Sequence, residues 1–207
     1  MNQGEPRIRI HGIIPAAGMS RRMGRPKQAL PFQGSTITGV VARTMCDAGL
    51  DTIIVVTRAE LADRLELPVD PRITVVLNQS ATCEMIDSVR LALAHIGREH
   101  RPFSNAGGTD GVLVVPGDMP TVPRSAYQRS IDAFAGDPSR IVIVSHRGRR
   151  GHPIIFPLAL AGLIQELDGG LNELPRKLAH SVTTVESDDP GILRDIDIPL
   201  DYKGIEP

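Results

Sequence analysis

Residues 13–27 read Ile13-Ile14-Pro15-Ala16-Ala17-Gly18-Met19-Ser20-Arg21-Arg22-Met23-Gly24-Arg25-Pro26-Lys27. An apolar run typical of a buried strand opens here into a loop of small residues, followed by cationic side chains. Small residues allow backbone N–H groups to approach a polyanion closely, because no large side chain stands in the way. The arginines and the lysine add positive charge, so this stretch predicts a phosphate-binding loop at the end of a strand.

Two well-known phosphate loops do not fit this stretch. A Walker loop requires Gly-x-x-x-x-Gly-Lys-Ser/Thr, whereas Gly24 stands six residues after Gly18 and is followed by Arg-Pro-Lys. A dinucleotide-binding turn requires Gly-x-Gly-x-x-Gly, and the second glycine is missing after Gly18. Pro26 prevents a direct continuation into a helix, because proline restricts the residue before it. The loop is therefore of a third kind, with a basic surface turn as the plain alternative.

Strand and helix patterns alternate along the rest of the chain. The expected strands are apolar or β-branched runs, at residues 8–15, 52–57, 73–77, 111–116 and 141–144. The expected helices cover residues 36–48, 59–65 and 87–96, and the first has Ser35 or Thr36 as its N-cap and Gly49 as its C-terminal stop. This order predicts the α/β class, with one domain over residues 1–207 built on a doubly wound, mostly parallel, Rossmann-like sheet.

Composition narrows the class of protein. With 41% hydrophobic residues over 207 positions the chain can bury a substantial core, and it has no run long and apolar enough for a membrane span and no secretory signal pattern. A net charge of −1 and 3% aromatic residues argue against nucleic-acid binding. Cys46 and Cys83 lie far apart and form no Cys-x-x-Cys pair. We therefore expect a cytoplasmic protein with neither membrane nor nucleic acid among its partners.

An acidic turn follows the expected strand at residues 111–116. Gly117-Asp118-Met119-Pro120 leaves that strand at the same sheet edge as the phosphate loop, because parallel strands present their carboxyl ends together. A carboxylate beside phosphate oxygens is a typical Mg²⁺ ligand. Asp118 is therefore expected to bind a metal ion, with a turn or N-cap role as the alternative.

Four motifs in order resemble the nucleotidyltransferases that activate molybdopterin, within the wider nucleoside-triphosphate transferase superfamily. The family's Ala-Ala-Gly-x-Ser-x-Arg-Met-Gly-x-x-Lys is matched by Ala16, Ala17, Gly18, Ser20, Arg22, Met23, Gly24 and Lys27. Gly117-Asp118-Met119-Pro120, Gly151-His152-Pro153 and residues 195–202 follow in the family's order. The resemblance covers nearly the whole chain and implies a Rossmann-like nucleotidyltransferase fold.

The resemblance also implies catalytic and metal-binding roles. Arg22 is expected on the β- and γ-phosphates and Lys27 on the α-phosphate, and both are expected to be catalytic together with Asp118. Mg²⁺, or alternatively Mn²⁺, is expected on Asp118 and Asp197. Asp195 stays open as the second ligand, because alternate side chains of an extended segment point the same way. A solvated acidic tail is the plain reading of this segment.

The nucleotide-binding residues that the resemblance implies are Ala16, Ala17, Gly18, Ser20, Arg22, Lys27, Asn78, Ser80 and Asp118. Ala16 and Ala17, with the segment around Asn78 and Ser80, correspond to the family's base-binding region. An Ala-Ala pair in the loop resembles the cytidylyl-transferring branch, whereas Gly-Gly resembles the guanylyl-transferring branch. CTP is therefore the favoured nucleotide.

Ser88 and His152 are the residues expected to bind the acceptor. Ser88 matches the serine of the family's Gly-Met-x-x-Ser, with a helix cap as the alternative. His152 follows a basic run that we expect to be flexible, and in which Arg149 and Arg150 are read as solvated surface charge. Residues 168–176 depart from the family's Gly-Asp-x-Gly-Ala-Arg, which leaves the acceptor open.

Three functions follow from these observations. In the leading one, the protein moves CMP from CTP to a molybdopterin-type cofactor, releases pyrophosphate and makes transient contact with a target molybdoenzyme. The second is a transferase that uses GTP, or another phosphorylated acceptor such as a sugar phosphate. The third is a catalytically silent cofactor carrier for a molybdoenzyme, against which the intact Arg22, Lys27 and Asp118 argue.

Overall fold

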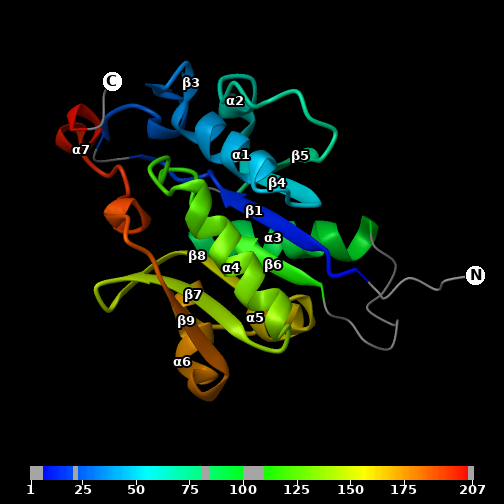
Figure 1. Ribbon diagram of the computed structural model, residues 1–207. Helices are drawn as coiled ribbons and strands as arrows, with labels where there is room; N and C mark the ends of the chain where they lie inside the picture. The colour runs from blue at the N-terminus through cyan, green and yellow to red at the C-terminus, as the bar shows by residue number, and fades with distance from the viewer. Residues whose placement is uncertain (1–6, 21–22, 81–83, 100–109, 205–207) are drawn as a thin grey trace, which may run out of the picture.

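A seven-stranded sheet runs through the centre of the protein, with strand order β5-β4-β1-β6-β8-β7-β9 (Figure 1). The structure is a computed structural model and describes residues 7–20, 23–80, 84–99 and 110–204. All strand pairs of this sheet are parallel except the two pairs that β8 makes, with β6 and with β7. The strands are β1 Ile10–Pro15, β4 Thr52–Thr57, β5 Ile73–Leu77, β6 Gly111–Val114, β7 Ile141–His146, β8 Arg149–Pro157 and β9 Val182–Glu186.

Helices cover both faces of the sheet. They are α1 Ile37–Asp47, α2 Ala59–Ala62, α3 Met85–Glu99, α4 Arg124–Gly136, α5 Ala161–Gln165, α6 Leu174–Lys177 and α7 Pro199–Lys203. Short 3₁₀ turns are η2 Lys27–Ala29, η3 Leu158–Leu160, η4 Leu171–Glu173, η5 Ala179–Ser181 and η6 Pro190–Leu193. A small hairpin of β2 Pro31–Phe32 and β3 Ser35–Thr36 follows η2.

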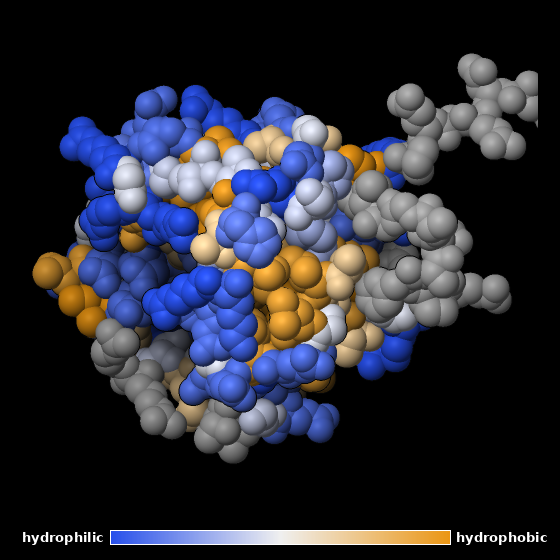
Figure 2. Space-filling model, turned by 90° about the horizontal axis from the view of Figure 1, so that it is seen from below, coloured by the Kyte–Doolittle hydropathy of each residue, from blue (hydrophilic) through white to orange (hydrophobic). Residues whose placement is uncertain are grey.

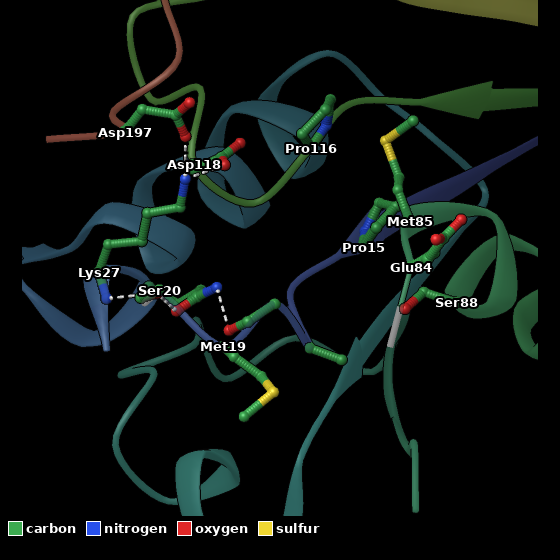
Figure 3. Close-up of a pocket in the computed structure, with 13 residues that line it drawn as sticks. Pro15, Met19, Ser20, Lys27, Glu84, Met85, Ser88, Pro116, Asp118 and Asp197 are labelled. Carbon is green, nitrogen blue, oxygen red and sulfur yellow. Dashed lines mark hydrogen bonds and ion pairs between the residues drawn. The ribbon is translucent and has the colours of Figure 1, made fainter. Parts of the chain in front are cut away.

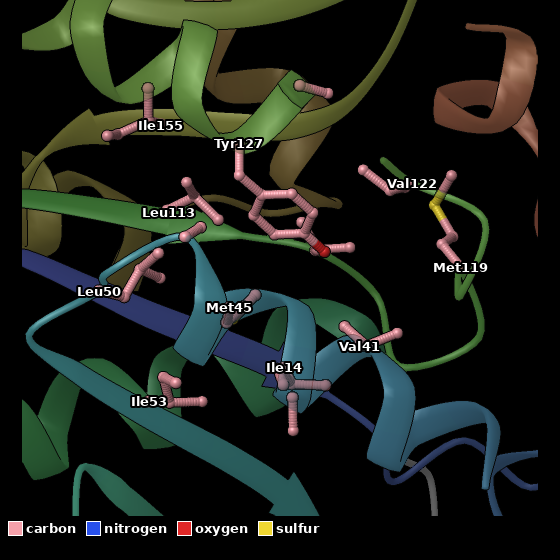
Figure 4. Packing of buried hydrophobic residues seen from close by; sticks show 14 of the residues in the cluster. Ile14, Val41, Met45, Leu50, Ile53, Leu113, Met119, Val122, Tyr127 and Ile155 are labelled. Atoms are coloured by element: carbon pink, nitrogen blue, oxygen red, sulfur yellow. The ribbon is translucent and has the colours of Figure 1, made fainter. Parts of the chain in front are cut away.

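Two hydrophobic layers hold the helices on the sheet. On one face, α1 and α4 contribute Val41, Met45 and Tyr127, which pack over strand residues such as Ile14 and Leu113 (Figure 4). On the other face, residues of α3 and α5 pack on the alternate residues of the same strands. Strands buried on both faces read as continuous apolar runs, which is why 52–57 and 111–114 carry no polar alternation. The α/β class and the mostly parallel sheet expected from the sequence are confirmed.

The carboxyl ends of β1, β4 and β6 meet at one edge of the sheet. β8 runs in the opposite direction beside β6, with Val114 opposite Ile154, so that the amino end of β8 reaches this same edge. Loops from β1, β6 and β8 therefore converge at one place, although they lie far apart in the sequence. Ligands bind at this edge in open α/β sheets.

Several expected element boundaries are confirmed. Residues 52–57 and 73–77 form strands as predicted. Thr36 is the N-cap of α1 and accepts a hydrogen bond from Gly39 N at 3.0 Å, and Gly49 adopts a positive φ of 83° just after the helix. The helix expected at 87–96 is longer and begins at Met85. The helix expected at 59–65 is shorter and ends at Ala62.

The expectation of a flexible segment around residues 146–150 is wrong. Strands β7 and β8 form an antiparallel hairpin there, with Ser145 opposite Arg150 and His146 opposite Arg149. Its two turn residues, Arg147 and Gly148, have φ values of 50° and 76°, as the turns that join twisted hairpins require. The charged residues at the start of β8 give no apolar pattern, so the strand is not visible in the sequence.

The surface combines charged and apolar side chains. Figure 2, a view from below, shows hydrophilic side chains around apolar ones that gather near the middle of this face. Among the residues that the structure describes, none of the helices has the length and hydropathy needed to cross a bilayer.

Candidate active site

The loop after β1 is held in shape by Ser20 and Gln28. Ser20 has a positive φ of 49°, an uncommon conformation for a residue with a side chain. Its hydroxyl donates to Gln28 Oε1 at 3.0 Å and accepts from Lys27 N at 3.1 Å. Gln28 Nε2 also donates to the Gly18 carbonyl at 3.0 Å. These bonds fold residues 18–20 back against η2, so the loop is preorganised around the base of Lys27.

Lys27 joins two carboxylates that come from distant parts of the chain. Its Nζ lies 2.7 Å from Asp118 Oδ2 and 2.7 Å from Asp197 Oδ1 (Figure 3). The lysine is 8% exposed. Burial lowers the pKa of Lys27, but the charges and hydrogen bonds of Asp118 and then of Asp197 outweigh burial, and the net pKa lies above its usual 10.5. The side chain is therefore a fixed cation at neutral pH.

Close backbone packing positions Asp118. Gly117 N donates to the Pro15 carbonyl at 2.9 Å, and Thr38 Oγ1 donates to the Gly117 carbonyl at 2.8 Å. A Cβ at Gly117 would lie 3.0 Å from Ala16 Cβ and 3.0 Å from Thr38 Oγ1, so glycine permits this approach of β6 to β1. Asp118 thus follows β6 at a fixed distance from the loop that carries Lys27.

Asp197 reaches the site from outside the sheet. After β9 the chain passes through η6 and crosses the carboxyl edge, where Ile196 N donates to the Asp118 carbonyl at 3.1 Å. This crossing places Asp197 opposite Lys27, whereas Asp195 lines the neighbouring cavity. Of the two carboxylates that the sequence left open, the geometry therefore brings Asp197 to Lys27 and Asp118.

A cavity of about 560 Å³ opens beside the cluster of Lys27, Asp118 and Asp197. The phosphate loop forms one wall, and α3 forms another through its first turn (Figure 3). The described residues that line it are Pro15, Ala17, Gly18, Met19, Ser20, Lys27, Gln28, Glu84, Met85, Ser88, Pro116, Asp118 and Asp197. Its cationic and small-residue wall has the chemistry that a triphosphate needs.

A second cavity, of about 640 Å³, adjoins the first. The two share Met85, Pro116 and Asp118, so they meet at the carboxylate that follows β6. Its lining combines arginines of β8 and α6 with aliphatic residues of β7, β8, η4 and η6. Its described lining also includes Met119, Ile143, Arg149, Arg150, Gly151, His152, Ile154, Leu171, Asn172, Pro175, Arg176, Ile192, Leu193 and Asp195.

The donor set between the cavities fits a hard divalent cation. Asp118 Oδ1 is buried and has no hydrogen-bond partner within the described residues, so one carboxylate oxygen is available to a ligand. The other oxygen and Asp197 Oδ1 already face a shared cation, the Lys27 ammonium. Groups of three or more His, Cys, Asp or Glu side chains arranged for a metal are absent from residues 7–20, 23–80, 84–99 and 110–204. Two carboxylates suit Mg²⁺ or Mn²⁺ that takes its remaining ligands from phosphates and water.

Not every residue expected in the site lines a cavity. Ala16 is buried in the core, and its backbone N–H and carbonyl bond to Val56 and Thr57 of β4. Asn78 is buried after β5 and accepts from Ser80 N at 2.9 Å, and neither residue is among the described lining of either cavity. Arg22 lies outside the described residues.

The two residues expected at the acceptor lie in different cavities. Ser88 is 2% exposed and faces the first cavity from inside α3, four residues into a helix that begins at Met85, so it is not a helix cap. His152 lines the second cavity, and its Nδ1 is 3.3 Å from the Val114 carbonyl. Burial lowers the pKa of His152 below its usual value, so the ring is neutral at pH 7.

Four side chains of the site escaped sequence reasoning. Gln28 braces the loop and is 3% exposed, yet a glutamine after a lysine gives no signal of its own. Arg149, Arg150 and Arg176 line the second cavity, whereas the sequence indicates only solvated surface charge for Arg149 and Arg150 and no role for Arg176. Arg149 and Arg150 reach the site because β8 is antiparallel to β6, and the sequence carries no signal of that direction.

Comparison with known proteins places the chain among nucleotide-handling enzymes. Residues 12–184 match the family described as the MobA-like NTP transferase domain. The chain is 28% identical to the purine catabolism protein PucB of Bacillus subtilis over 196 residues, which is 92% of this chain and 93% of that one. It is 28% identical to the molybdenum cofactor cytidylyltransferase of Escherichia coli over 196 residues, which is 93% of each chain. It is 26% identical to the probable molybdenum cofactor guanylyltransferase of Rhodopirellula baltica over 198 residues, which is 92% of this chain and 88% of that one.

Solved structures agree with this assignment. The Mycobacterium tuberculosis protein Rv0371c has 29% sequence identity and a TM-score of 0.77, with 96% of this chain and 97% of that chain covered. A structure of Rv0371c in complex with manganese has 26% identity and a TM-score of 0.70, over 96% of this chain and 97% of that chain. The sequence motifs, the fold and the family match over most of the chain agree, and we conclude that this protein is a nucleotidyltransferase that belongs to the MobA-like NTP transferase family.

Proposed function

We propose that the protein transfers CMP from CTP to a molybdopterin-type cofactor and releases pyrophosphate. The observation that carries this proposal is the position of Asp118, which lines both adjoining cavities and lies 2.7 Å from the Lys27 ammonium of the first. A triphosphate over Gly18 and Ser20 would bring its α-phosphate to Lys27. An acceptor phosphate in the second cavity would approach from the side of Asp118, which both cavities share.

Charge neutralisation is the main task of such a site, because both reactants are anionic. Lys27 binds the α-phosphate in this proposal and stabilises the negative charge that develops there, and Arg22 binds the β- and γ-phosphates. Backbone N–H groups of the loop orient the triphosphate. Asp118 and Asp197 hold Mg²⁺ or Mn²⁺, which supplies further charge neutralisation when bound.

The second cavity suits an anionic acceptor with an apolar ring system. Arg149, Arg150 and Arg176 offer positive charge, while Ile154 and Leu193 offer apolar surface. His152, as a neutral imidazole, would give this acceptor one hydrogen bond. The E. coli relative is named for the molybdenum cofactor, an acceptor of this chemical type. We assign Ser88 to the nucleotide side, since it faces the first cavity.

CTP is preferred over GTP in this proposal because of the Ala16-Ala17 pair. The pair resembles the cytidylyl-transferring branch, and Ala17 lines the first cavity. Ala16, Asn78 and Ser80 would then act from behind the cavity wall, by setting the path of the backbone that meets the base. A guanylyltransferase is the second candidate, because the relative from Rhodopirellula carries that name.

The proposal is tested by measuring pyrophosphate release from CTP, GTP, ATP and UTP in turn, with Mg²⁺ and the molybdenum-loaded cofactor. We expect release with CTP and none without the cofactor. Release with GTP instead would retain the reaction and overturn the choice of base. If none of the four nucleotides releases pyrophosphate, the proposed reaction is overturned, and another acceptor or a catalytically inactive carrier is favoured.

A pair of aspartate variants sharpens this test. Asp118→Asn removes a proposed metal ligand at the carboxyl end of β6, whereas Asp110→Asn removes an ion-paired carboxylate at the amino end of the same strand, 2.6 Å from Arg9. We expect Asp118→Asn to lower turnover by roughly 100-fold or more and Asp110→Asn to leave it near the native value. Equal turnover in the two variants would show that Asp118 has no catalytic role.

A further inference from the structure

The second carboxylate of the site has no strand or helix to support it. Asp197 lies in the crossing segment between η6 and α7, and its side chain is 35% exposed. The hydrogen bond from Ile196 N to the Asp118 carbonyl, at 3.1 Å, ties the preceding residue to the site. The ion pair with Lys27 Nζ, at 2.7 Å, holds the carboxylate, and the backbone at residues 197 and 198 decides from where that carboxylate is presented.

Asp201 restrains this backbone. Its Oδ2 accepts hydrogen bonds from Asp197 N and from Ile198 N, both at 2.9 Å. One carboxylate oxygen thus binds two successive backbone donors, which restricts the backbone at 197 and 198 and directs the Asp197 side chain toward the cluster. The bond to Ile198 N is half of a capping box, since Ile198 is the N-cap of α7 and Asp201 is its third residue. The bond to Asp197 N goes beyond what a cap requires.

The helix that carries Asp201 is itself anchored to the phosphate loop. Tyr202 OH donates to the Pro31 carbonyl at 2.6 Å, and the guanidinium of Arg25 lies 5.8 Å from the centre of the Tyr202 ring. Tyr202 is buried in a small separate cluster, which we call the C-terminal cluster and which consists of Met23, Leu30, Phe32, Ile37, Val40, Ile196 and Tyr202. Asp201 is therefore held by the same segment, residues 23–40, that carries Lys27.

We propose that Asp201 is a positioning residue, which fixes Asp197 at the metal site by binding the amides of residues 197 and 198. This inference rests on the proposed function, in which Asp197 is a metal ligand. Hydrogen-bond partners behind a metal ligand set its orientation, and their loss weakens metal binding by roughly 10- to 100-fold. Asp201 has this relation to Asp197 without facing either cavity itself.

The test measures Mn²⁺ alone binding to the free protein, by the loss of the free-ion signal in electron paramagnetic resonance. We expect Asp201→Ala to weaken Mn²⁺ binding by roughly tenfold or more. Asp201→Asn keeps a carbonyl oxygen in the same place and should bind Mn²⁺ within about threefold of the native protein. Amide hydrogen exchange at residues 197 and 198 should be faster in the alanine variant and close to native in the asparagine variant.

Asp189 provides a matched control. Its Oδ1 accepts from Gly191 N at 2.7 Å and caps η6 in the same C-terminal part of the chain, but it makes no contact with the amide of Asp197. Asp189→Ala should therefore lose a similar cap and retain Mn²⁺ binding. Equal weakening in Asp189→Ala and Asp201→Ala would overturn the positioning role, since any damage to this segment would then suffice.

A further variant separates failure of this inference from failure of the proposed function. Asp197→Ala should weaken Mn²⁺ binding at least as much as Asp201→Ala. If Asp197→Ala weakens binding and Asp201→Ala does not, the positioning role is wrong and the metal site stands. If Asp197→Ala leaves Mn²⁺ binding unchanged, the metal site of the proposed function is wrong and the positioning role falls with it. An asparagine variant as weak as Asp201→Ala would also overturn the hydrogen-bonding account.

Discussion

At the scale of single residues, Lys27 is the side chain that joins the two carboxylates of the site. It is nearly buried, it is charged at neutral pH, and it is the point at which the phosphate loop, β6 and the C-terminal segment meet. The two carboxylates around it would repel one another without a cation between them. A phosphate that draws Lys27 away would leave that position to a divalent ion.

Lys27→Met should therefore affect the chemical step much more than nucleotide binding. We expect kcat to fall by roughly 100-fold or more, because a cation at the reacting phosphate is lost, while KM for the nucleotide changes much less. Lys177→Met, on the exposed side of α6, is the control and should keep native kinetics. Steady-state measurement of pyrophosphate release gives both constants. A kcat of Lys27→Met within a few-fold of native would remove Lys27 from the proposed mechanism.

The free energy of unfolding should depend on pH through the single residue Cys46. Burial, and then the negative charge of Asp70, raise the pKa of the Cys46 thiol to about 11. Since this pKa is higher in the folded than in the unfolded protein, the stability that it contributes is present below about pH 9 and is lost as the pH rises toward 11. Urea unfolding at pH 8 and pH 10.5 should show a larger loss of stability in the native protein than in Cys46→Ala. Equal losses would contradict the raised pKa.

At the scale of elements, the β7–β8 hairpin builds the second cavity. The first residues of β8, Arg149 to His152, lie at the edge of the sheet where β6 ends, because β8 is antiparallel to β6. η6 packs on this hairpin so closely that a Cβ at Gly151 would lie 2.3 Å from the Ile192 carbonyl oxygen. The spacing between β8 and η6 therefore sets the width of the cavity.

Gly151→Ala should widen that spacing and weaken acceptor binding. We expect a loss of about 1–3 kcal/mol in the free energy of unfolding and a raised KM for the acceptor, with KM for the nucleotide unchanged. Gly162→Ala is the control, because a Cβ there meets no atom within 4 Å and alanine favours the helix α5. Chemical unfolding and acceptor titration check both effects. An unchanged acceptor KM in Gly151→Ala would show that η6 does not shape the second cavity.

The sequence predicted five strands of the sheet, β1, β4, β5, β6 and β7, and missed the antiparallel β8 and the parallel edge strand β9. Runs such as 52–57 are apolar on both faces, and that pattern identifies a buried parallel strand directly. The first residues of β8 are polar or charged because they line a cavity, so they lack the alternation of apolar residues that identifies a strand. The resemblance favoured Asp197 over Asp195, but the side-chain alternation of an extended segment left both open, because it does not show where the chain crosses the sheet edge after η6.

At the scale of the whole molecule, the two cavities share one wall. Met85, Pro116 and Asp118 belong to both, so a nucleotide and an acceptor can occupy the protein together without a large movement of the sheet. Pro116 and Asp118 belong to the loop that follows β6, and Met85 is the first residue of α3.

Nucleotide binding should stabilise the whole molecule in a metal-dependent way. CTP with Mg²⁺ at about 100 times its dissociation constant adds roughly 2.7 kcal/mol to the free energy of unfolding, which raises Tm by roughly 5–10 °C in a chain of this size. Asp118→Asn should keep the part of the shift that CTP gives alone and lose the part that Mg²⁺ adds. Thermal unfolding with CTP, Mg²⁺ or both measures these parts. A full Mg²⁺-dependent shift in Asp118→Asn would contradict the assigned metal ligand.

The central claim is that a nucleotide in the first cavity meets a metal ion held by Asp118 and Asp197. Anomalous diffraction from crystals of the protein with CTP and Mn²⁺ tests it most directly, because it locates the ion and the triphosphate together. The account predicts an Mn²⁺ peak bonded to both aspartates, with the triphosphate over Gly18 and Ser20 and Lys27 turned to the α-phosphate. An Mn²⁺ peak away from these carboxylates, or a triphosphate in the cavity that holds His152, would contradict it.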